Sequence, residues 1–127
     1  KNIAPSLIEN KLKFSPFIKE AILIGDKRKY PTALIQLELE NVENWAQSNS
    51  ITYTTYKSLA LNPQVNELIA EEVERVNREF SQAEKVKKFR ILDKELDHDD
   101  GEITATMKVK RNIIEKKFGD LIDSMYK

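Results

Sequence analysis

A chain of 127 residues that is 40% hydrophobic and 33% charged has the size and composition of one globular domain. Its 21 basic residues balance its 21 acidic residues, which argues against a dedicated binder of nucleic acid or of an anionic membrane, because such proteins need a positive field. The absence of cysteine excludes disulfides and thiolate metal sites, and the longest purely apolar run, residues 21–24, is too short to span a bilayer. With no signal peptide in view, we expect a cytoplasmic single domain that binds no nucleic acid.

The first predicted element is a helix that begins near Ala4. Pro5 suits the first helical turn, because the N–H that proline lacks would have no partner there. The helix would end before Pro16, which biases the preceding residue away from helical geometry. Three apolar residues would share its buried face: Leu7, Ile8 and Leu12.

Two strands are predicted next, paired as an antiparallel hairpin. Residues 18–24 have a centre that is apolar at both parities, which is typical of a strand covered on both faces, and residues 25–29 form a charged turn. Residues 32–40 form the second strand. Apolar and polar residues alternate in its second half, so we expect one face there to be exposed to solvent.

Three helices are predicted in the middle of the chain. Asn41 would cap a short one, and Thr54 or Thr55 would cap another. Asn62 followed by Pro63 begins the strongest helical pattern, whose polar face is acidic where a membrane-surface helix would be basic, so we expect it to cover a sheet. Its apolar residues repeat at helical spacing: Val65, Leu68, Ile69, Val73, Val76 and Phe80.

Residues 86–92 are predicted to form a third strand. Basic residues lie in it and just before it: Lys85, Lys87, Lys88 and Arg90. A solvated strand face is the ordinary interpretation of such a cluster, and contact with nucleotide phosphates is the alternative. The acidic loop 93–100 follows and holds the one histidine, His98. No metal site is predicted there, because a calcium loop would need Leu96 as its first ligand and zinc would need further His or Cys ligands.

The last predicted element is a helix capped by Asn112. Its apolar stripe would comprise Ile114, Phe118, Leu121, Ile122 and Met125. Together these elements predict an α+β fold, with a small mixed or antiparallel sheet of about three strands covered by helices. The chain has no glycine-rich phosphate loop and no nucleophile elbow, so any catalytic role would be to lend a residue to a site elsewhere.

Residues 101–111 combine a turn, a threonine-rich run and three cations. We expect Gly101 to adopt a positive φ as it ends the acidic loop. If the run is extended, Thr104, Thr106 and Lys108 project to one side, opposite Ile103, Ala105, Met107 and Val109. On composition alone, this is a solvated strand with lysines on its wet face.

Residues 104–111, Thr-Ala-Thr-Met-Lys-Val-Lys-Arg, resemble the closing lysine motif of the adenylate-forming acyl-CoA ligases, in the variant typical of long-chain fatty-acid–CoA ligases. Most members have Thr-x-x-Gly-Lys there, and Met107 stands where that glycine would be. Residues 1–9, Lys-Asn-Ile-Ala-Pro-Ser-Leu-Ile-Glu, resemble the segment just after the family's hinge. The resemblance covers essentially the whole chain, but only the small C-terminal domain of such a ligase.

The resemblance implies that residues 1–127 are a single swinging lid domain, with the N-terminal domain that binds ATP, magnesium and the acyl group absent from the chain. It makes Lys108 the catalytic lysine, in a reaction that joins a fatty acid to ATP and then transfers the acyl group to CoA. Positions near the nucleotide would be Thr106, Lys110 and Arg111. Positions near the CoA channel would be Lys1, Asn2 and Ile3. The resemblance leaves open a peripheral contact between the full-length enzyme and a membrane, and this domain would not make that contact.

Two alternatives remain at this stage. A register shift of two residues would give the catalytic role to Lys110, but it would place Val109 at the glycine position and leave one residue before the helix cap. The other alternative is a free-standing interaction module that catalyses nothing. A long upstream region with a phosphate loop would favour the ligase, and a start codon close to Lys1 would favour the module.

Overall fold

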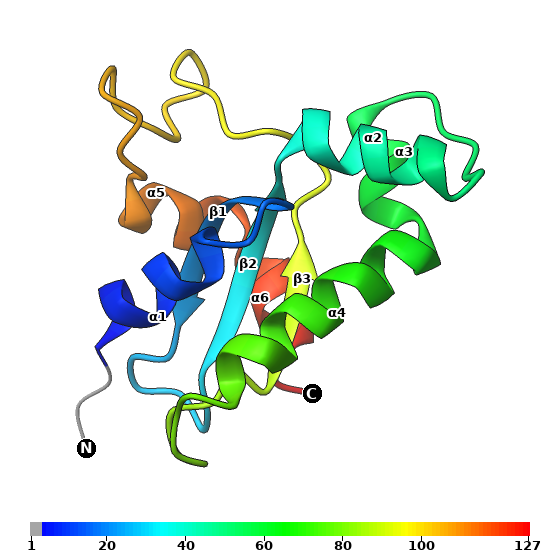
Figure 1. Cartoon of the computed structure of the whole chain (residues 1–127). Helices are drawn as coiled ribbons and strands as arrows, with labels where there is room; N and C mark the ends of the chain where they lie inside the picture. The colour runs from blue at the N-terminus through cyan, green and yellow to red at the C-terminus, as the bar shows by residue number, and fades with distance from the viewer. Residues whose placement is uncertain (1–3) are drawn as a thin grey trace.

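The computed structural model describes residues 4–127, which form an α+β fold around a three-stranded sheet. The sheet contains β1 (Ile18–Ile24), β2 (Thr32–Leu37) and β3 (Lys88–Ile91), in the order β1-β2-β3 (Figure 1). β1 pairs with β2 in antiparallel fashion, and β2 pairs with β3 in parallel, so the predicted hairpin and the mixed sheet are both confirmed. Every residue of the central strand is buried, because helices cover both faces of the sheet.

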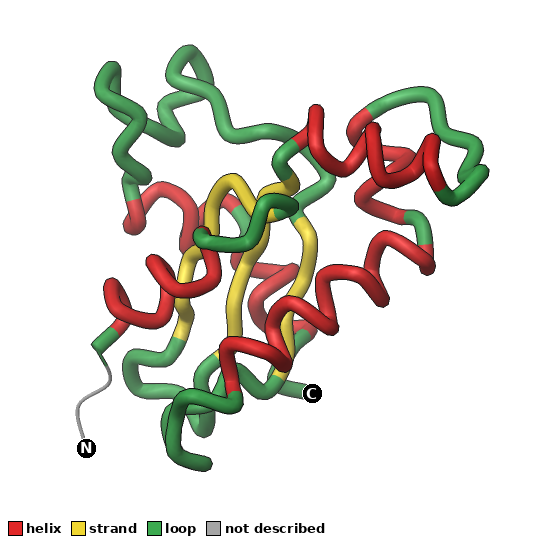
Figure 2. Tube along the Cα trace, in the orientation of Figure 1, coloured by secondary structure: helices red, strands yellow, loops and turns green. Residues whose placement is uncertain are grey.

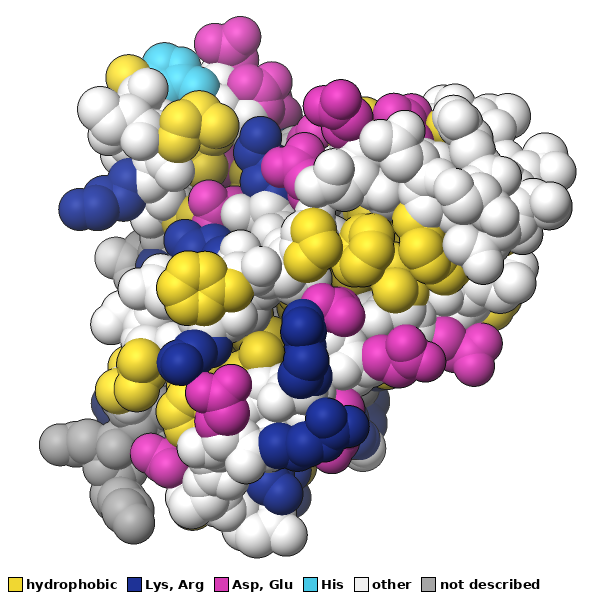
Figure 3. All heavy atoms as spheres, in the orientation of Figure 1, with side chains coloured by type: hydrophobic (Ala, Val, Ile, Leu, Met, Phe, Trp, Pro, Cys, Tyr) yellow, Lys and Arg dark blue, Asp and Glu magenta, His cyan; other side chains and the backbone are white. Residues whose placement is uncertain are grey.

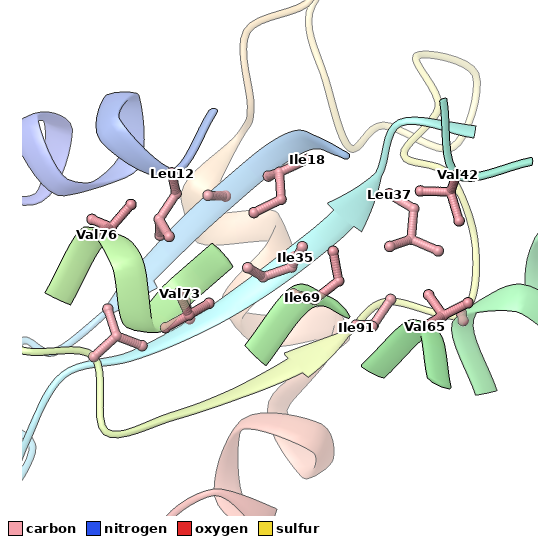
Figure 4. Packing of buried hydrophobic residues seen from close by; sticks show 14 of the residues in the cluster. Leu12, Ile18, Ile35, Leu37, Val42, Val65, Ile69, Val73, Val76 and Ile91 are labelled. Atoms are coloured by element: carbon pink, nitrogen blue, oxygen red, sulfur yellow. The ribbon is translucent and has the colours of Figure 1, made fainter. Parts of the chain in front are cut away.

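One face of the sheet packs against α1 (Pro5–Lys13) and α4 (Pro63–Asn77), as Figure 4 shows. The predicted α4 begins as expected, since the side chain of Asn62 accepts hydrogen bonds from the N–H groups of Gln64 at 2.8 Å and Val65 at 3.1 Å. Its apolar stripe supplies the core, although Phe80 lies beyond the helix end and packs there half-buried. In α1, Ile8 and Leu12 are buried but Leu7 is 50% exposed, so the predicted face is narrower than the pattern indicated.

The opposite face packs against α5 (Arg111–Lys117) and α6 (Gly119–Ser124). The single C-terminal helix that the pattern predicted is therefore wrong: Phe118, at φ −107° and ψ 26°, leaves helical geometry and separates the two. Asn112 is not the cap either, because α5 follows directly on Lys110. The apolar stripe still faces the sheet, with Ile114, Ile122 and Met125 buried.

The segment after β2 also departs from the predicted boundaries. β2 ends at Leu37, and α2 (Leu39–Ser48) begins after Glu38, so the predicted cap Asn41 lies inside the helix and donates to the carbonyl of Pro16 at 2.6 Å. The expected wet face of β2 is wrong as well. Gln36 is 3% exposed, because the loop after β3 covers it and the N–H of Leu96 donates to its side-chain oxygen at 3.2 Å.

A short helix, α3 (Tyr56–Leu61), joins α2 to α4. Of the two cap candidates, Thr55 is the one used: its hydroxyl accepts the N–H of Ser58 at 3.3 Å, and the Ser58 hydroxyl accepts the N–H of Thr55 at 3.0 Å. The helical track through α2, α3 and α4 carries the chain from the end of β2 back to the start of β3 (Figure 2). This return makes the β2–β3 pairing parallel.

The chain end is attached to the β1–β2 hairpin through two tyrosines. Tyr126 donates to the carbonyl of Tyr30 at 2.8 Å, and Tyr30 donates to the carbonyl of Met125 at 2.7 Å. Their rings stack with centroids 4.9 Å apart, and the Arg28 guanidinium lies 4.9 Å from the Tyr126 ring. These contacts hold α6 over the sheet.

Basic and acidic side chains are interspersed over the face shown in Figure 3, in keeping with the equal numbers of the two in the sequence. Within residues 4–127, no helix has both the length and the apolar character that crossing a bilayer requires.

Candidate functional site

Residues 102–110 form a tight reversal of the chain, which we call the Lys108 hairpin. Ile103 and Val109 form an antiparallel bridge, the N–H of Thr104 donates to the carbonyl of Lys108 at 2.8 Å, and the N–H of Met107 donates back to Thr104 at 2.9 Å. The run is therefore not extended, so the alternation of side chains expected of an extended run does not apply. The loop that contains the hairpin projects beyond the end of the sheet, between β3 and α5 (Figures 1 and 2).

The turn of the hairpin places Met107 in a backbone conformation that favours glycine. Met107 has a φ of 69°, in the left-handed region, which costs a residue with a Cβ about 1–2 kcal/mol relative to glycine. Its side chain is 54% exposed, so a long residue fits there without a pocket. Gly101, at φ 76°, confirms the expectation of a positive φ at the end of the acidic loop.

Hydrogen bonds fix the backbone of Lys108, whereas its ammonium group stays available to bind an anion. The Thr104 hydroxyl accepts the N–H of Lys108 at 3.0 Å and lies 3.1 Å from the Thr106 hydroxyl. The Lys108 side chain is exposed, and it makes no ion pair within 4.0 Å to any described residue. A fixed backbone that carries an unpaired ammonium suits a group that must meet an incoming anion.

Thr106, Met107 and Lys108 line one side of a groove of about 490 Å³. The other side is lined by α1 and β1, with Lys13 and Glu20 facing each other at 3.6 Å. Burial raises the pKa of Glu20, and the neighbouring Lys13 opposes that rise only in part.

Arg111 is bound by the fold itself. Its guanidinium donates to the carbonyl of Leu23 at 2.8 Å and to the carboxylate of Glu9 at 2.7 Å, and the same Glu9 oxygen accepts the N–H of Leu23 at 2.7 Å. We call these three residues the Arg111 clasp; it ties α1, β1 and the start of α5 together. Lys110, by contrast, is exposed and has no ion pair in the part of the chain that the structure describes.

Glu102 lies at the base of the hairpin, and its side chain is 0% exposed. One carboxylate oxygen accepts from Lys94 and from the N–H of Asp97 at 2.9 Å, and the other accepts from Lys117 at 2.7 Å. Burial alone would raise the pKa of Glu102, but the hydrogen bonds from Lys117, Lys94 and Asp97 outweigh it and hold the pKa below its ordinary value.

Sequence reasoning missed both Glu102 and Glu9. The two lysine partners of Glu102 lie eight and fifteen residues away along the chain, and Glu9 meets Arg111 across 102 residues. No local pattern connects such positions. The one available signal was that Glu102 directly precedes the buried Ile103, which is weak evidence on its own that the acidic side chain is buried.

The other predicted positions are dispersed. In the basic cluster, Lys87 donates to the carbonyl of Gln82 at 2.8 Å, and Arg90 donates to that of Ser124 at 3.4 Å. The predicted CoA-channel positions Lys1, Asn2 and Ile3 lie outside the described residues. Among residues 4–127, no three His, Asp or Glu side chains are grouped closely enough to hold a metal ion.

Comparison with known proteins places these features in a wider group. Residues 1–127 match the family described as "AMP-binding enzyme C-terminal domain". The long-chain-fatty-acid–CoA ligase FadD15 of Mycobacterium tuberculosis is 39% identical over 127 residues, covering 99% of this chain and 21% of that protein. The long-chain-fatty-acid–CoA ligase ACSBG2 of Gallus gallus is 32% identical over 143 residues, covering 98% and 19%. The chain thus spans about a fifth of the length of the curated relatives that it matches.

A solved structure with the same fold is the adenylation domain of the carboxylate reductase from Mycobacterium chelonae. Its TM-score is 0.74 at 19% identity, and the match covers 98% of this chain and 18% of that chain. At that identity, the likeness shows that the two share a fold.

Proposed function

Because the chain belongs to the family of AMP-binding enzyme C-terminal domains, we propose that residues 1–127 are the C-terminal domain of an ATP-dependent long-chain fatty-acid–CoA ligase. The support for the long-chain substrate is the naming of relatives such as FadD15. In this proposal, the remaining four-fifths of the enzyme contain an N-terminal domain that binds ATP, magnesium and the fatty acid. That domain is the partner on which this one acts, and CoA is the second substrate.

The proposed reaction has two steps. The fatty-acid carboxylate attacks the α-phosphorus of ATP, which forms the acyl-adenylate and releases pyrophosphate. The thiolate of CoA then attacks the acyl carbonyl carbon, which forms the thioester and releases AMP. The C-terminal domain swings between two orientations, so that it presents a different face to the active site in each step.

Lys108 is the residue that we propose for the first step. A carboxylate that approaches the α-phosphate brings two anions together, and an ammonium between them stabilises the transition state. The observation that carries this assignment is the Lys108 hairpin, which fixes the lysine backbone and leaves its ammonium exposed and without an ion pair among residues 4–127. Thr106 would lie beside the nucleotide, with Lys110 nearby.

In the second orientation, the segment around the hinge turns toward the pantetheine channel. Lys1, Asn2 and Ile3 are the positions that would then lie near CoA. Arg111, held in its clasp, would support the hairpin from below while Lys108 meets the substrate.

The test is Lys108→Ala in the full-length ligase, with the two half-reactions assayed separately. Loss of one preorganised electrostatic contact costs roughly a hundred- to a thousandfold in rate, and we expect acyl-adenylate formation to slow by that factor. Thioester formation from supplied acyl-adenylate and CoA should stay within about tenfold of the parent, because Lys108 then faces solvent. The matched controls are Lys110→Ala, which tests the register, and Lys116→Ala, which removes an exposed lysine from α5.

The 127-residue chain alone serves as a further control and should catalyse no ATP–pyrophosphate exchange, because it has no phosphate loop. Equal slowing of both half-reactions by Lys108→Ala would contradict the assignment. A selective defect in Lys110→Ala, with Lys108→Ala unaffected, would move the role to Lys110.

A further inference from the structure

Glu102 is the one acidic residue that is fully buried among residues 4–127, and it lies where both arms of the Lys108 hairpin begin. Its backbone takes part in the hairpin, since its carbonyl accepts the N–H of Lys110 at 2.9 Å and its N–H donates to Asp97 at 3.2 Å. Its side chain connects the hairpin to two other segments. Lys94 and Asp97 belong to the loop after β3, and Lys117 ends α5.

The charges in this network make Glu102 more than a packing residue. Two ammonium groups converge on a carboxylate that water does not reach, while the two lysine side chains are 35% and 41% exposed. Without the negative charge, Lys94 would keep only its more exposed partner Asp100, at 3.1 Å, and Lys117 would lose its ion pair with Glu102. The three segments would then lose their common attachment.

A movement at the base of the Lys108 hairpin would be transmitted along the hairpin to Lys108. The Ile103–Val109 bridge and the hydrogen bond from Thr104 to the Lys108 carbonyl make the hairpin a short rigid ladder. Buried Ile103 anchors one arm in the apolar core between the sheet and the helices α5 and α6, whereas the other arm is tied at its base by the bond from Lys110 to Glu102. The direction of Lys108 therefore depends on how firmly that base is closed.

We propose that Glu102 is a positioning residue for Lys108: its buried carboxylate, bound by Lys94 and Lys117, locks the base of the Lys108 hairpin and so fixes the direction in which the lysine extends. This inference rests on the proposed function of Lys108. It assigns to Glu102 no contact with substrate. Its effect is confined to the step in which Lys108 faces the active site.

The first measurement is amide hydrogen exchange by NMR in the 127-residue chain, for Glu102→Gln. Glutamine keeps the size of the side chain, but it carries no charge and turns an N–H₂ donor toward one of the lysines. We expect the N–H groups of Thr104 and Lys110 to exchange at least about tenfold faster, with the amides of β2 unchanged; tenfold corresponds to about 1.4 kcal/mol. The matched control is Glu79→Gln, which removes a carboxylate paired with Lys11 at 3.0 Å on the surface.

The second measurement follows the two half-reactions in the full-length ligase. For Glu102→Gln, we expect the kcat of acyl-adenylate formation to fall about tenfold, with the KM for ATP within about twofold and thioester formation unchanged. Lys117→Gln removes one of the bonds to Glu102 from a partly exposed position, and it should give a smaller defect in the same step alone. This second variant keeps the test decisive if Glu102→Gln folds poorly.

The outcomes separate this inference from the function on which it rests. Exchange at Thr104 and Lys110 that is equal in Glu102→Gln and Glu79→Gln would overturn the inference. So would normal adenylation in Glu102→Gln and Lys117→Gln when Lys108→Ala is selectively slow, and in that case the proposed function would stand. If Lys108→Ala slows both steps equally, the proposed function fails and with it the catalytic meaning of Glu102.

Discussion

Replacing Arg111 by methionine should cost the domain measurable stability, because the guanidinium closes the Arg111 clasp. The side chain of Glu9 is only 12% exposed, and it relies on Arg111 at 2.7 Å to neutralise its charge. A charge-assisted hydrogen bond contributes about 1.5–3 kcal/mol. Arg111 is 42% exposed, so solvent screening reduces the expected coupling between the two side chains to about 1–2 kcal/mol.

A double-mutant cycle measures that coupling directly. The variants are Glu9→Gln, Arg111→Met and the double variant, unfolded in urea and followed by the fluorescence of Trp45, the only tryptophan. If the unfolding free energy falls by about 2 kcal/mol per M of urea, the coupling energy shifts the unfolding midpoint of the double variant by about 0.5–1 M from the midpoint expected if the two single effects were additive. The matched control is the exposed pair Lys11–Glu79, whose coupling should not exceed about 0.5 kcal/mol.

The same variant distinguishes two roles for Arg111 in the full-length ligase. If Arg111 supports the fold, Arg111→Met should leave the KM for ATP within about twofold at temperatures where the variant is folded. Coupling no larger than that of the control pair, together with a KM for ATP raised about tenfold, would refute the clasp and return Arg111 to the nucleotide.

Two further predictions concern buried polar groups. Asn77 donates to the carbonyl of Val86 at 2.9 Å and accepts the N–H of Val86 at 2.9 Å, so Asn77→Ala should lower the unfolding free energy by about 3 kcal/mol in urea titrations. The control is Asn44→Ala at an exposed position, which should change the unfolding free energy by no more than about 0.5 kcal/mol. An equally small loss in Asn77→Ala would contradict the reasoning. The pKa of Glu102 is lower in the folded state than its ordinary 4.5, so its stabilising contribution is present above pH 4.5 and is lost as the pH falls through the folded-state pKa. The stability difference between the parent and Glu102→Gln should therefore be constant near neutral pH and shrink in acid; a difference that grows in acid would reverse the sign of the argument.

The elements that could be predicted from the sequence are those whose determinants are local. Asn62 and Pro63 mark the start of α4 because a cap and a first-turn proline act within a few residues of each other. The apolar centre of β1 likewise indicates that this strand is buried on both faces, whichever parts of the chain supply the covering helices. The positive φ of Gly101 followed from turn chemistry alone.

The errors arise where distant parts of the chain decide the outcome. Gln36 alternates with apolar neighbours as an exposed residue would, yet Leu96 covers it from 60 residues away. The break at Phe118 does have a local signal, because Gly119 follows it and glycine commonly ends a helix, but the apolar spacing of residues 114–125 continues across the break and favoured a single helix. The pattern of the threonine run is that of an extended segment, but Thr104 accepts the N–H groups of Met107 and Lys108, and these hydrogen bonds fold the run back on itself.

The candidate site divides in the same way. The motif predicts a role for Lys108, and the structure shows that Met107, the residue before that lysine, adopts a positive φ. The groups that hold the hairpin, Glu102 and Glu9, carry no motif. They became visible only when the fold brought Lys117 and Arg111 to them.

The parallel pairing of β2 with β3 sets the order in which this domain can fold. β1 and β2 are joined by a short turn and can pair early, whereas β3 must wait until the chain has passed through α2, α3 and α4, and closing so long a loop is entropically slow. The Lys108 hairpin comes later still along the chain, and its anchor Ile103 packs into a cluster that includes Ile22 and Leu34 of the sheet. We therefore expect the lysine to reach its final geometry among the last events of folding, so that a domain arrested before β3 docks would contain no ordered Lys108 hairpin.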